Sequence, residues 1–254
     1  MNLSIQAITP PDIPHLAQIS SDAFLSDRHT QMKATGAVPY DMAAAMRSDL
    51  PRNLRSRMRV CIKAVDEQTG EAVGWTCWGF RGFAEEEVDA LEPLRGSVDE
   101  DEGLGAVSAS ASGASNREGG SGTTVEPEGV LEESLVRLNA LESEDMRRWM
   151  RILMPDGSRC MFIVGLYVAP AFQGRGVGSA LLSWGTEVAD RFGVYVWVHS
   201  SEAGWRAFSK HGFEVVGMLE VDLDEWAPKS PPTEEGEDAN WGMYTFRYMK
   251  RLSE

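Results

Sequence analysis

The spacing of apolar and polar residues predicts strands near both ends of the chain. Residues 3–8 alternate between the two types, as a half-buried strand does. The apolar run at 160–168 ("CMFIVGLYV") is continuous, which is typical of a central strand buried on both faces. Residues 59–65 and 72–80 flank the turn "DEQTGE" and are expected to form a hairpin. Further strands are expected over residues 194–198, 213–221 and 243–249.

Apolar residues three and four positions apart predict helices between these strands. The helices are expected over residues 10–24, 40–59, 131–154, 177–192 and 202–210. Thr9 can cap the first of them, Pro51 should interrupt or restart the second, and Gly193 should end the fourth.

The composition changes between residues 84 and 130, where Ser, Gly and acidic residues replace apolar ones. The segment holds twelve Asp or Glu and two Arg, which is −10 of the net charge of −15. So few apolar residues cannot bury enough surface to offset the entropy lost on ordering. We therefore expect a disordered acidic insertion, which is either a spacer or a regulatory or partner-binding segment.

Charge and cysteine content restrict the expected partners and compartment. A net charge of −15 argues against nucleic-acid binding; the acidity suits a cationic amine substrate, or serves solubility alone. Cys61, Cys77 and Cys160 are odd in number and lack metal-ligand spacing, so we expect neither a disulfide framework nor a metal site. Buried thiols suit a reducing compartment. Neither a signal peptide nor a transmembrane run is visible, so we expect a cytoplasmic, or nuclear, protein with no membrane partner.

A glycine-rich stretch from Gln173 to Ser179 ("QGRGVGS"), here called the glycine turn, connects the apolar run to the following helix. Glycines let backbone amides approach a ligand closely, and amides at a helix start are unpaired donors at the positive end of the dipole. The glycine turn therefore predicts a pyrophosphate site, unless its glycines serve only a tight turn. No Lys follows Gly178, which excludes a Walker A loop, and the spacing does not fit a dinucleotide fingerprint.

The stretch "LYVAPAFQGRGVGSALLSWG" resembles motif A of the GCN5-related N-acetyltransferases (GNAT), whose pattern is Gln/Arg-x-x-Gly-x-Gly/Ala after a strand. Gln173, Gly176 and Gly178 match that pattern, and "EAGWRAFSKHGFEVVG" resembles the next motif of the family. The resemblance implies an α/β (mixed α+β) fold with a mixed central sheet, splayed at the cofactor site and flanked by helices. It also implies one domain built from residues 1–83 and 131–254, with 84–130 inserted.

The resemblance further implies acetyl-CoA as cosubstrate and a primary amine, on a small molecule or a peptide, as acceptor. The backbone of the last strand residues and of the glycine turn would hold the cofactor, and Phe208 would pack against its pantetheine arm. The expected cofactor residues are Leu166, Tyr167, Val168, Gln173, Gly174, Arg175, Gly176, Val177, Gly178, Ser179 and Phe208. Acceptor recognition is expected from residues 22–59 and 222–241. The sequence indicates no oligomeric state.

The chemistry requires the amine to lose a proton before it attacks the thioester, so a general base or a water chain is expected. His199 follows an apolar strand and is the first candidate, or else a structural histidine; Glu202 is the second. The family often places a tyrosine where this chain has Phe208, which cannot protonate the leaving thiolate. Either the thiolate leaves unassisted, or a donor such as Tyr167 or Ser209 acts. This departure leaves an alternative open, a catalytically weak acyl-CoA-binding or regulatory protein.

Overall fold

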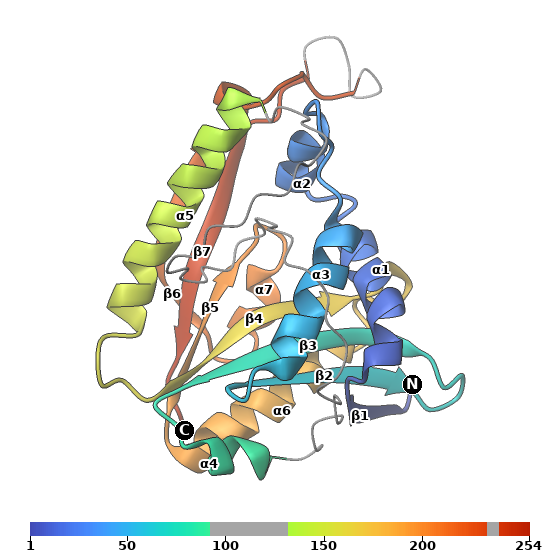
Figure 1. Cartoon of the computed structure of the whole chain (residues 1–254), viewed down its shortest axis with the longest axis vertical. Helices are drawn as coiled ribbons and strands as arrows, with labels where there is room; N and C mark the ends of the chain where they lie inside the picture. Colours follow the sequence, from blue (N-terminus) through green and yellow to red (C-terminus); the bar gives the residue numbers. More distant parts are fainter. Residues whose placement is uncertain (92–131, 233–238) are drawn as a thin grey trace, which may run out of the picture.

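The computed structural model describes residues 1–91, 132–232 and 239–254, whose strands form one mixed sheet (Figure 1). The strands are β1 (Leu3–Ala7), β2 (Arg59–Asp66), β3 (Ala72–Arg81), β4 (Cys160–Val168), β5 (Tyr195–Ser200), β6 (Glu214–Asp222) and β7 (Met243–Arg251). Their order in the sheet is β1-β2-β3-β4-β5-β7-β6. Only β4 and β5 pair in parallel; the other neighbours are antiparallel. The implied fold class, a mixed sheet flanked by helices, is confirmed.

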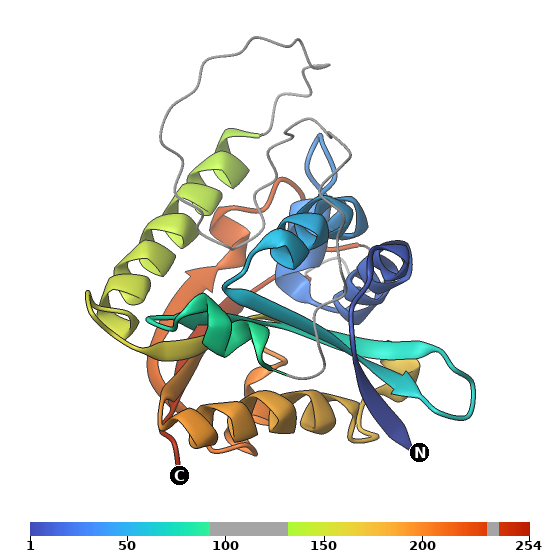
Figure 2. The same cartoon turned by 60° about the horizontal axis from the view of Figure 1, so that its bottom comes forward.

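The helices cover both faces of the sheet (Figures 1 and 2). They are α1 (Ile13–Ala23), α2 (Arg28–Ala34), α3 (Met42–Arg55), α4 (Glu85–Asp89), α5 (Glu133–Leu153), α6 (Val177–Phe192) and α7 (Trp205–Ser209), with short 3-10 turns at Pro10–Asp12, Pro170–Phe172 and Leu223–Glu225. One face, the α6 face, is packed by α6, α4 and α7. The opposite face, the α5 face, is packed by α1 and α3 over one half of the sheet and by α5 over the other.

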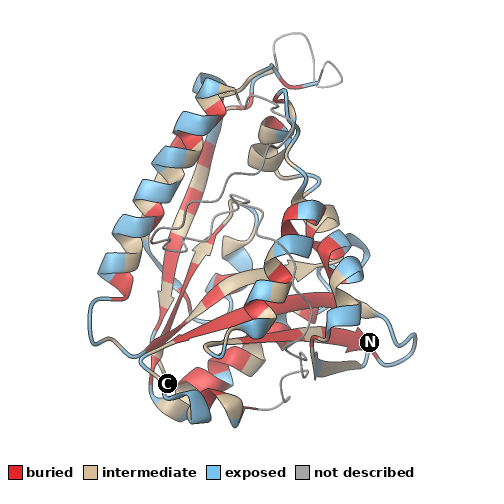
Figure 3. Cartoon of the chain, viewed as in Figure 1, coloured by how far each residue is buried: buried red, intermediate tan, exposed pale blue. Residues whose placement is uncertain are grey.

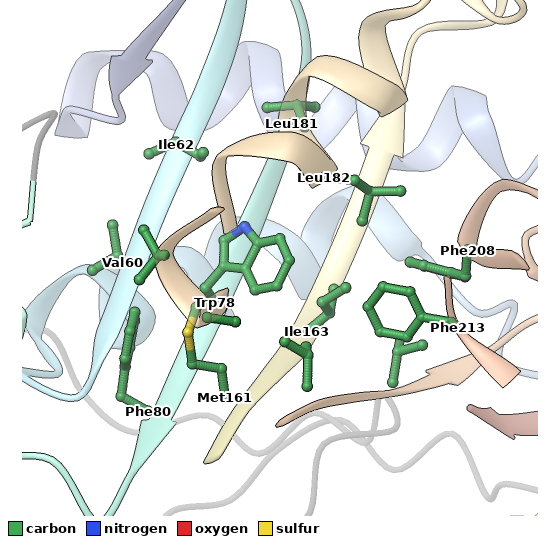
Figure 4. Close-up of a cluster of buried hydrophobic side chains, with 14 of the residues drawn as sticks. Val60, Ile62, Trp78, Phe80, Met161, Ile163, Leu181, Leu182, Phe208 and Phe213 are labelled. Carbon is green, nitrogen blue, oxygen red and sulfur yellow. The ribbon is translucent and has the colours of Figure 1, made fainter. Parts of the chain in front are cut away.

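The largest apolar core lies between the sheet and α6. Trp78 of β3 is fully buried at its centre, with Met161 and Ile163 of β4 on one side and Leu181 and Leu182 of α6 above (Figure 4). The burial of these large side chains is the main stabilising contribution in a fold of this kind. The middle strands are accordingly buried along most of their length, while α5 exposes its outer side (Figure 3).

The expected strands and the expected helices are present, with ends shifted by a few residues. The expected break at Pro51 is wrong, because α3 continues through that residue. A proline inside a helix costs one hydrogen bond. Buried residues on both sides of it, Met46, Leu50 and Asn53, hold the helix in place. Helix α2 was not expected, since Met32 is its only buried residue and its sequence has no apolar repeat.

Two further expectations need correction. The segment expected to be disordered from residue 84 begins instead with α4, whose Val88 joins the α6-face core, and Leu91 is buried there too. The rest of that segment, residues 92–130, lies outside the described residues. Strand β4 is not buried on both faces throughout: its first residues are, but residues 164–168 are half-buried, because β4 loses its neighbour β5 there.

Across the three described ranges, no helix combines the length and the apolar character needed to cross a membrane.

Candidate active site

Strands β4 and β5 separate in the middle of the sheet. Their pairing runs from Cys160 opposite Tyr195 to Ile163 opposite Val198 and stops there. Strand β4 continues to Val168 while bonded to β3, and β5 continues to Ser200 while bonded to β7. The backbone edges that face each other beyond this point have no strand partner in the described chain. The expected splay is therefore present, and an extended amide-containing ligand could bond to these edges as an added strand does.

A β-bulge lies at the point of separation. On β3, Cys77 is opposite Gly165 and Trp78 is opposite Ile163, so Val164 of β4 is the extra residue. A bulged residue is left out of the regular ladder, and its backbone groups are redirected. The site thus has an irregular backbone position on the strand that borders the opening.

The glycine turn lies beyond the end of β4 and leads into the N-terminus of α6. Gly174 and Gly176 have φ of +72° and +89°, a region that other residues rarely adopt, and ideal Cβ atoms there would meet nothing within 4 Å. Gly176 is the N-cap, and the amide of Ala180 makes the first helical bond to its carbonyl. The preceding amides of α6 have no acceptor within the helix. Open space at a helix N-terminus is suited to an anion.

The side chains of the glycine turn have different roles. Arg175 is exposed, with its guanidinium 5.7 Å from the Phe172 ring centroid, so its charge is available near the helix start. Gln173 Nε2 donates to the Val168 carbonyl at 3.2 Å, which fixes the turn on the end of β4. Val177 is buried in the α6-face core and anchors the helix.

Tyr167 lies on the α5 face, whereas Leu166 and Val168 pack toward the α6-face core. Its ring stacks on Trp75 with centroids 4.7 Å apart, and it folds back over Gly165, where any Cβ would clash with it. Burial raises the pKa of Tyr167, with the nearby Tyr40, Cys77 and Asp49 adding to the shift. Tyr167 therefore keeps its proton at neutral pH and is a weaker acid than an exposed tyrosine.

His199 lies on β5 just beyond the last β4 partner, also on the α5 face. Its ring stacks on Phe246 of β7 (centroids 4.9 Å apart, planes at 25°) and lies 4.7 Å from the Tyr248 ring centroid. His199 Nε2 is buried and has no hydrogen-bond partner within the described residues. Burial lowers the pKa of His199 to about 4, so the imidazole is neutral at physiological pH and has an acceptor position open.

Glu202, the other sequence-predicted base, is engaged elsewhere. Arg28 of α2 donates to its carboxylate at 2.6 Å and to the Met243 carbonyl at 2.8 Å. The Glu202 amide donates to the hydroxyl of Tyr244, which in turn donates to Asp27 at 2.7 Å. Glu202 thus ties the loop after β5 to α2 and β7, which is a structural role.

A half-buried cluster of His29, Lys33 and Glu142 joins α2 to α5 behind His199. Glu142 of α5 accepts from His29 Nε2 at 2.5 Å and from Lys33 Nζ at 2.7 Å. Burial alone would raise the pKa of Glu142, but these two donors outweigh it and lower the pKa to about 2. The His29 ring also packs edge-on against Phe246, the same ring that His199 stacks on. The wall behind His199 is therefore assembled from four elements, α2, α5, β5 and β7.

Phe208 belongs to the core rather than to an open surface. It is 6% exposed and packs edge-on against Phe213 in the α6-face cluster. The hydroxyl of Ser209, the next residue and the last of α7, does not take the buried position of Phe208, because Ser209 is exposed.

Sequence reasoning missed Asp49 of α3. Burial raises the pKa of this carboxyl group despite Arg52 and Arg59 nearby, and its charge is felt by Tyr40 and Tyr167. A signal was present: Asp49 follows Ala45 and Met46 at helical spacing, on the buried side of α3. The His29–Glu142 cluster had no comparable signal, because its members are 113 residues apart in sequence.

Comparisons with known proteins agree with this architecture. Residues 128–213 match the model of the Acetyltransferase (GNAT) family. The mosquito arylalkylamine N-acetyltransferase like 5b has 12% identity and a TM-score of 0.54, covering 99% of this chain and 100% of that one. A structure described as histone acetyltransferase HPA2 and related acetyltransferase, from Corynebacterium glutamicum, has 13% identity and a TM-score of 0.51, covering 100% and 98%. No curated protein matches the chain in sequence.

The matched segment contains β4, the glycine turn, α6, β5 and α7, which are the elements that build the splayed opening. Structural similarity at such low sequence identity shows the fold alone. The match to the family model adds sequence similarity over the segment that holds the glycine turn. Residues 128–213 thus resemble the GNAT acetyltransferase family, and the fold of the chain resembles that of solved acetyltransferase structures.

Proposed function

We propose that this protein is an N-acetyltransferase that moves an acetyl group from acetyl-CoA to a primary amine. The observation that carries the proposal is the glycine turn, an open helix N-terminus that follows β4, the strand that parts from β5. The match of residues 128–213 to the GNAT family implies an acyl-CoA donor, and the proposed acceptor is the primary amine of a small molecule or of a peptide.

The described residues fit a CoA molecule. Open space surrounds Gly174 and Gly176, and the first amides of α6 have no acceptor within the helix, so this turn can bind a pyrophosphate, with Arg175 as a further cationic donor. The unpaired edge of β4 over Leu166, Tyr167 and Val168 suits the amides of a pantetheine arm. When bound, acetyl-CoA supplies an activated acetyl thioester.

The chain's own groups then have distinct roles. We assign the redirected backbone at the Val164 bulge to polarising the reacting carbonyl. His199 Nε2, neutral and without a partner in the described chain, accepts the proton that the amine must lose, directly or through water. Donation of a proton toward the leaving sulfur is assigned to the Tyr167 hydroxyl, which retains its proton at neutral pH.

Acceptor recognition is assigned to the α5 face. The carboxylate of Asp49 in α3, which pairs with Arg52 at 3.1 Å, acts electrostatically on Tyr40 and Tyr167, and we assign the approach of the amine to this side. A carboxylate there attracts an ammonium group before deprotonation. Recognition of the acceptor by residues 22–59 is part of this proposal.

One observation favours the alternative, a catalytically weak acyl-CoA-binding or regulatory protein. Phe208 fills its core position with a ring that has no exchangeable proton. In that case CoA binding would remain while turnover would be lost.

The test is a turnover assay with the purified full chain, acetyl-CoA and a panel of primary amines that includes alkylamines, arylalkylamines and peptides. Release of the CoA thiol, matched by a 42-Da gain on one amine, supports the enzyme. CoA binding without thiol release for every amine supports the alternative. Absence of CoA binding contradicts both.

A further inference from the structure

Two of the three cysteines face each other across neighbouring strands. Cys61 of β2 is the direct register partner of Cys77 of β3, and the two Sγ atoms are 2.7 Å apart. Both side chains are buried, under α1 and α3 on the α5 face. Cys160 lies in a different cluster, beneath α5. Nothing in the sequence pairs these residues, since 15 residues separate them and no short cysteine motif is present.

The backbone at this pair has the geometry that a cross-strand disulfide needs. The carbonyl of Cys61 accepts from the amide of Ile8, on the side of β2 away from β3. A strand residue directs its N–H and C=O to the same edge, so Cys61 and Cys77 form a non-hydrogen-bonded pair. In such pairs the Cα atoms are about 4.5 Å apart, within the range of 4.4–6.8 Å found in disulfides.

We propose that Cys61 and Cys77 are a redox-active pair that forms an intramolecular disulfide when the protein meets a peroxide. The sulfur atoms need to approach by only about 0.7 Å to reach the covalent distance of 2.03–2.05 Å. One thiolate attacks the peroxide O–O bond, which yields a sulfenic acid and hydroxide. The second thiol then displaces the hydroxyl group as water, so two thiols and one hydrogen peroxide give one disulfide and two waters.

The pair lies beside the proposed site of chemistry. Cys77 is opposite Gly165, next to the Val164 bulge, and its thiol contributes to the raised pKa of Tyr167. A disulfide there would covalently join β2 to β3, the strand against which β4 rests. It would add a constraint to the unfolded chain and so raise thermal stability.

The experiment treats the fully reduced full-length protein with hydrogen peroxide, then denatures it and alkylates the remaining thiols. Peptide mapping identifies the linked cysteines. We expect the number of alkylated cysteines to fall from three to one, the remaining one being Cys160, with an intact mass about 2 Da lower before alkylation. The thermal midpoint should rise by about 5–10 °C and return after reduction.

Matched variants separate this pair from general cysteine oxidation. Cys160→Ser should still form the disulfide and show the same rise, whereas Cys61→Ser and Cys77→Ser should show neither. The proposal is overturned if wild-type protein keeps three alkylatable thiols, or if it gains oxygen on single cysteines without a link. A disulfide that includes Cys160 or joins two chains would also overturn it. None of these outcomes depends on acetyl transfer.

Discussion

The glycine turn and the wall behind His199 serve one proposed site, yet they are built in opposite ways. The glycine turn is a contiguous stretch at the start of α6, and its properties follow from backbone conformation. The wall takes side chains from α2, α5, β5 and β7, held by the Glu142 cluster and the Phe246 ring. A site made of backbone groups can be recognised in a short stretch of sequence. A site made of side chains from distant segments exists only once the whole fold has formed.

This difference predicts where each region is vulnerable. The glycine turn should fail through local changes that leave stability largely intact. The wall should fail through changes that also loosen the fold, because its charged groups double as the contacts between α2 and α5. Four substitutions test this contrast.

The largest effect is expected for Gly176→Asp. A side chain at φ +89° strains the turn, and a negative charge would occupy the anion site, so CoA affinity should fall about 1,000-fold by calorimetry. Gly157→Asp is the matched control: it also has positive φ (+77°) and open space, but lies in the turn before β4. Equal CoA affinity in Gly176→Asp and wild type would show that the glycine turn is not part of the CoA-binding site.

The next effect is on stability, for Glu142→Gln. Loss of the carboxylate leaves the half-buried His29 and Lys33 without their anionic partner, so the free energy of unfolding should fall by about 3 kcal/mol in urea titrations. Glu144→Gln, exposed on the same helix, should change little.

The same pair of variants gives a pH test. The folded pKa of Glu142, about 2, lies below its ordinary 4.5. The stabilisation is therefore fully present above pH 4.5 and is lost as the pH falls toward 2. The stability gap between wild type and Glu142→Gln should narrow over this range. A gap that stays constant would show that the carboxylate charge is not what binds α2 to α5.

His199→Gln should lower kcat about 100-fold and leave CoA affinity unchanged, because a proton acceptor is lost while the glycine turn is untouched. Since the pKa of His199 is about 4, wild-type activity should fall as the pH drops through that value, and the variant should lack this limb. An unchanged kcat would make His199 a structural histidine.

The smallest effect is expected for Arg175→Ala. Its exposed guanidinium adds one charged donor to a site made mainly of amides, so CoA affinity should fall about 10-fold at low salt. The loss should shrink as ionic strength rises. Arg191→Ala, at the opposite end of α6, is the control.

The contrast also explains what could be predicted from the sequence. The order of strands and helices along the chain and the presence of the glycine turn follow from the spacing of neighbouring residues. Both could therefore be predicted, and the predicted fold class is confirmed. Helix α2 was not predicted, because its position depends on contacts such as Arg28 with Glu202, 174 residues away. Pro51 misled for a similar reason, since tertiary packing at Leu50 outweighs a local helix breaker. The assignment of the individual site residues remains a proposal.

The connection between β3 and β4 has a consequence for how the molecule folds. These strands are antiparallel neighbours, with Arg81 opposite Cys160, yet residues 82–159 lie between them. Closing a loop of this length costs about 2 kcal/mol more entropy than closing a five-residue hairpin. The pairing of β3 with β4 at the centre of the sheet should therefore form late in folding, after the β2–β3 hairpin and the β6–β7 pair. Recovery of CoA binding during refolding should then lag behind recovery of secondary structure.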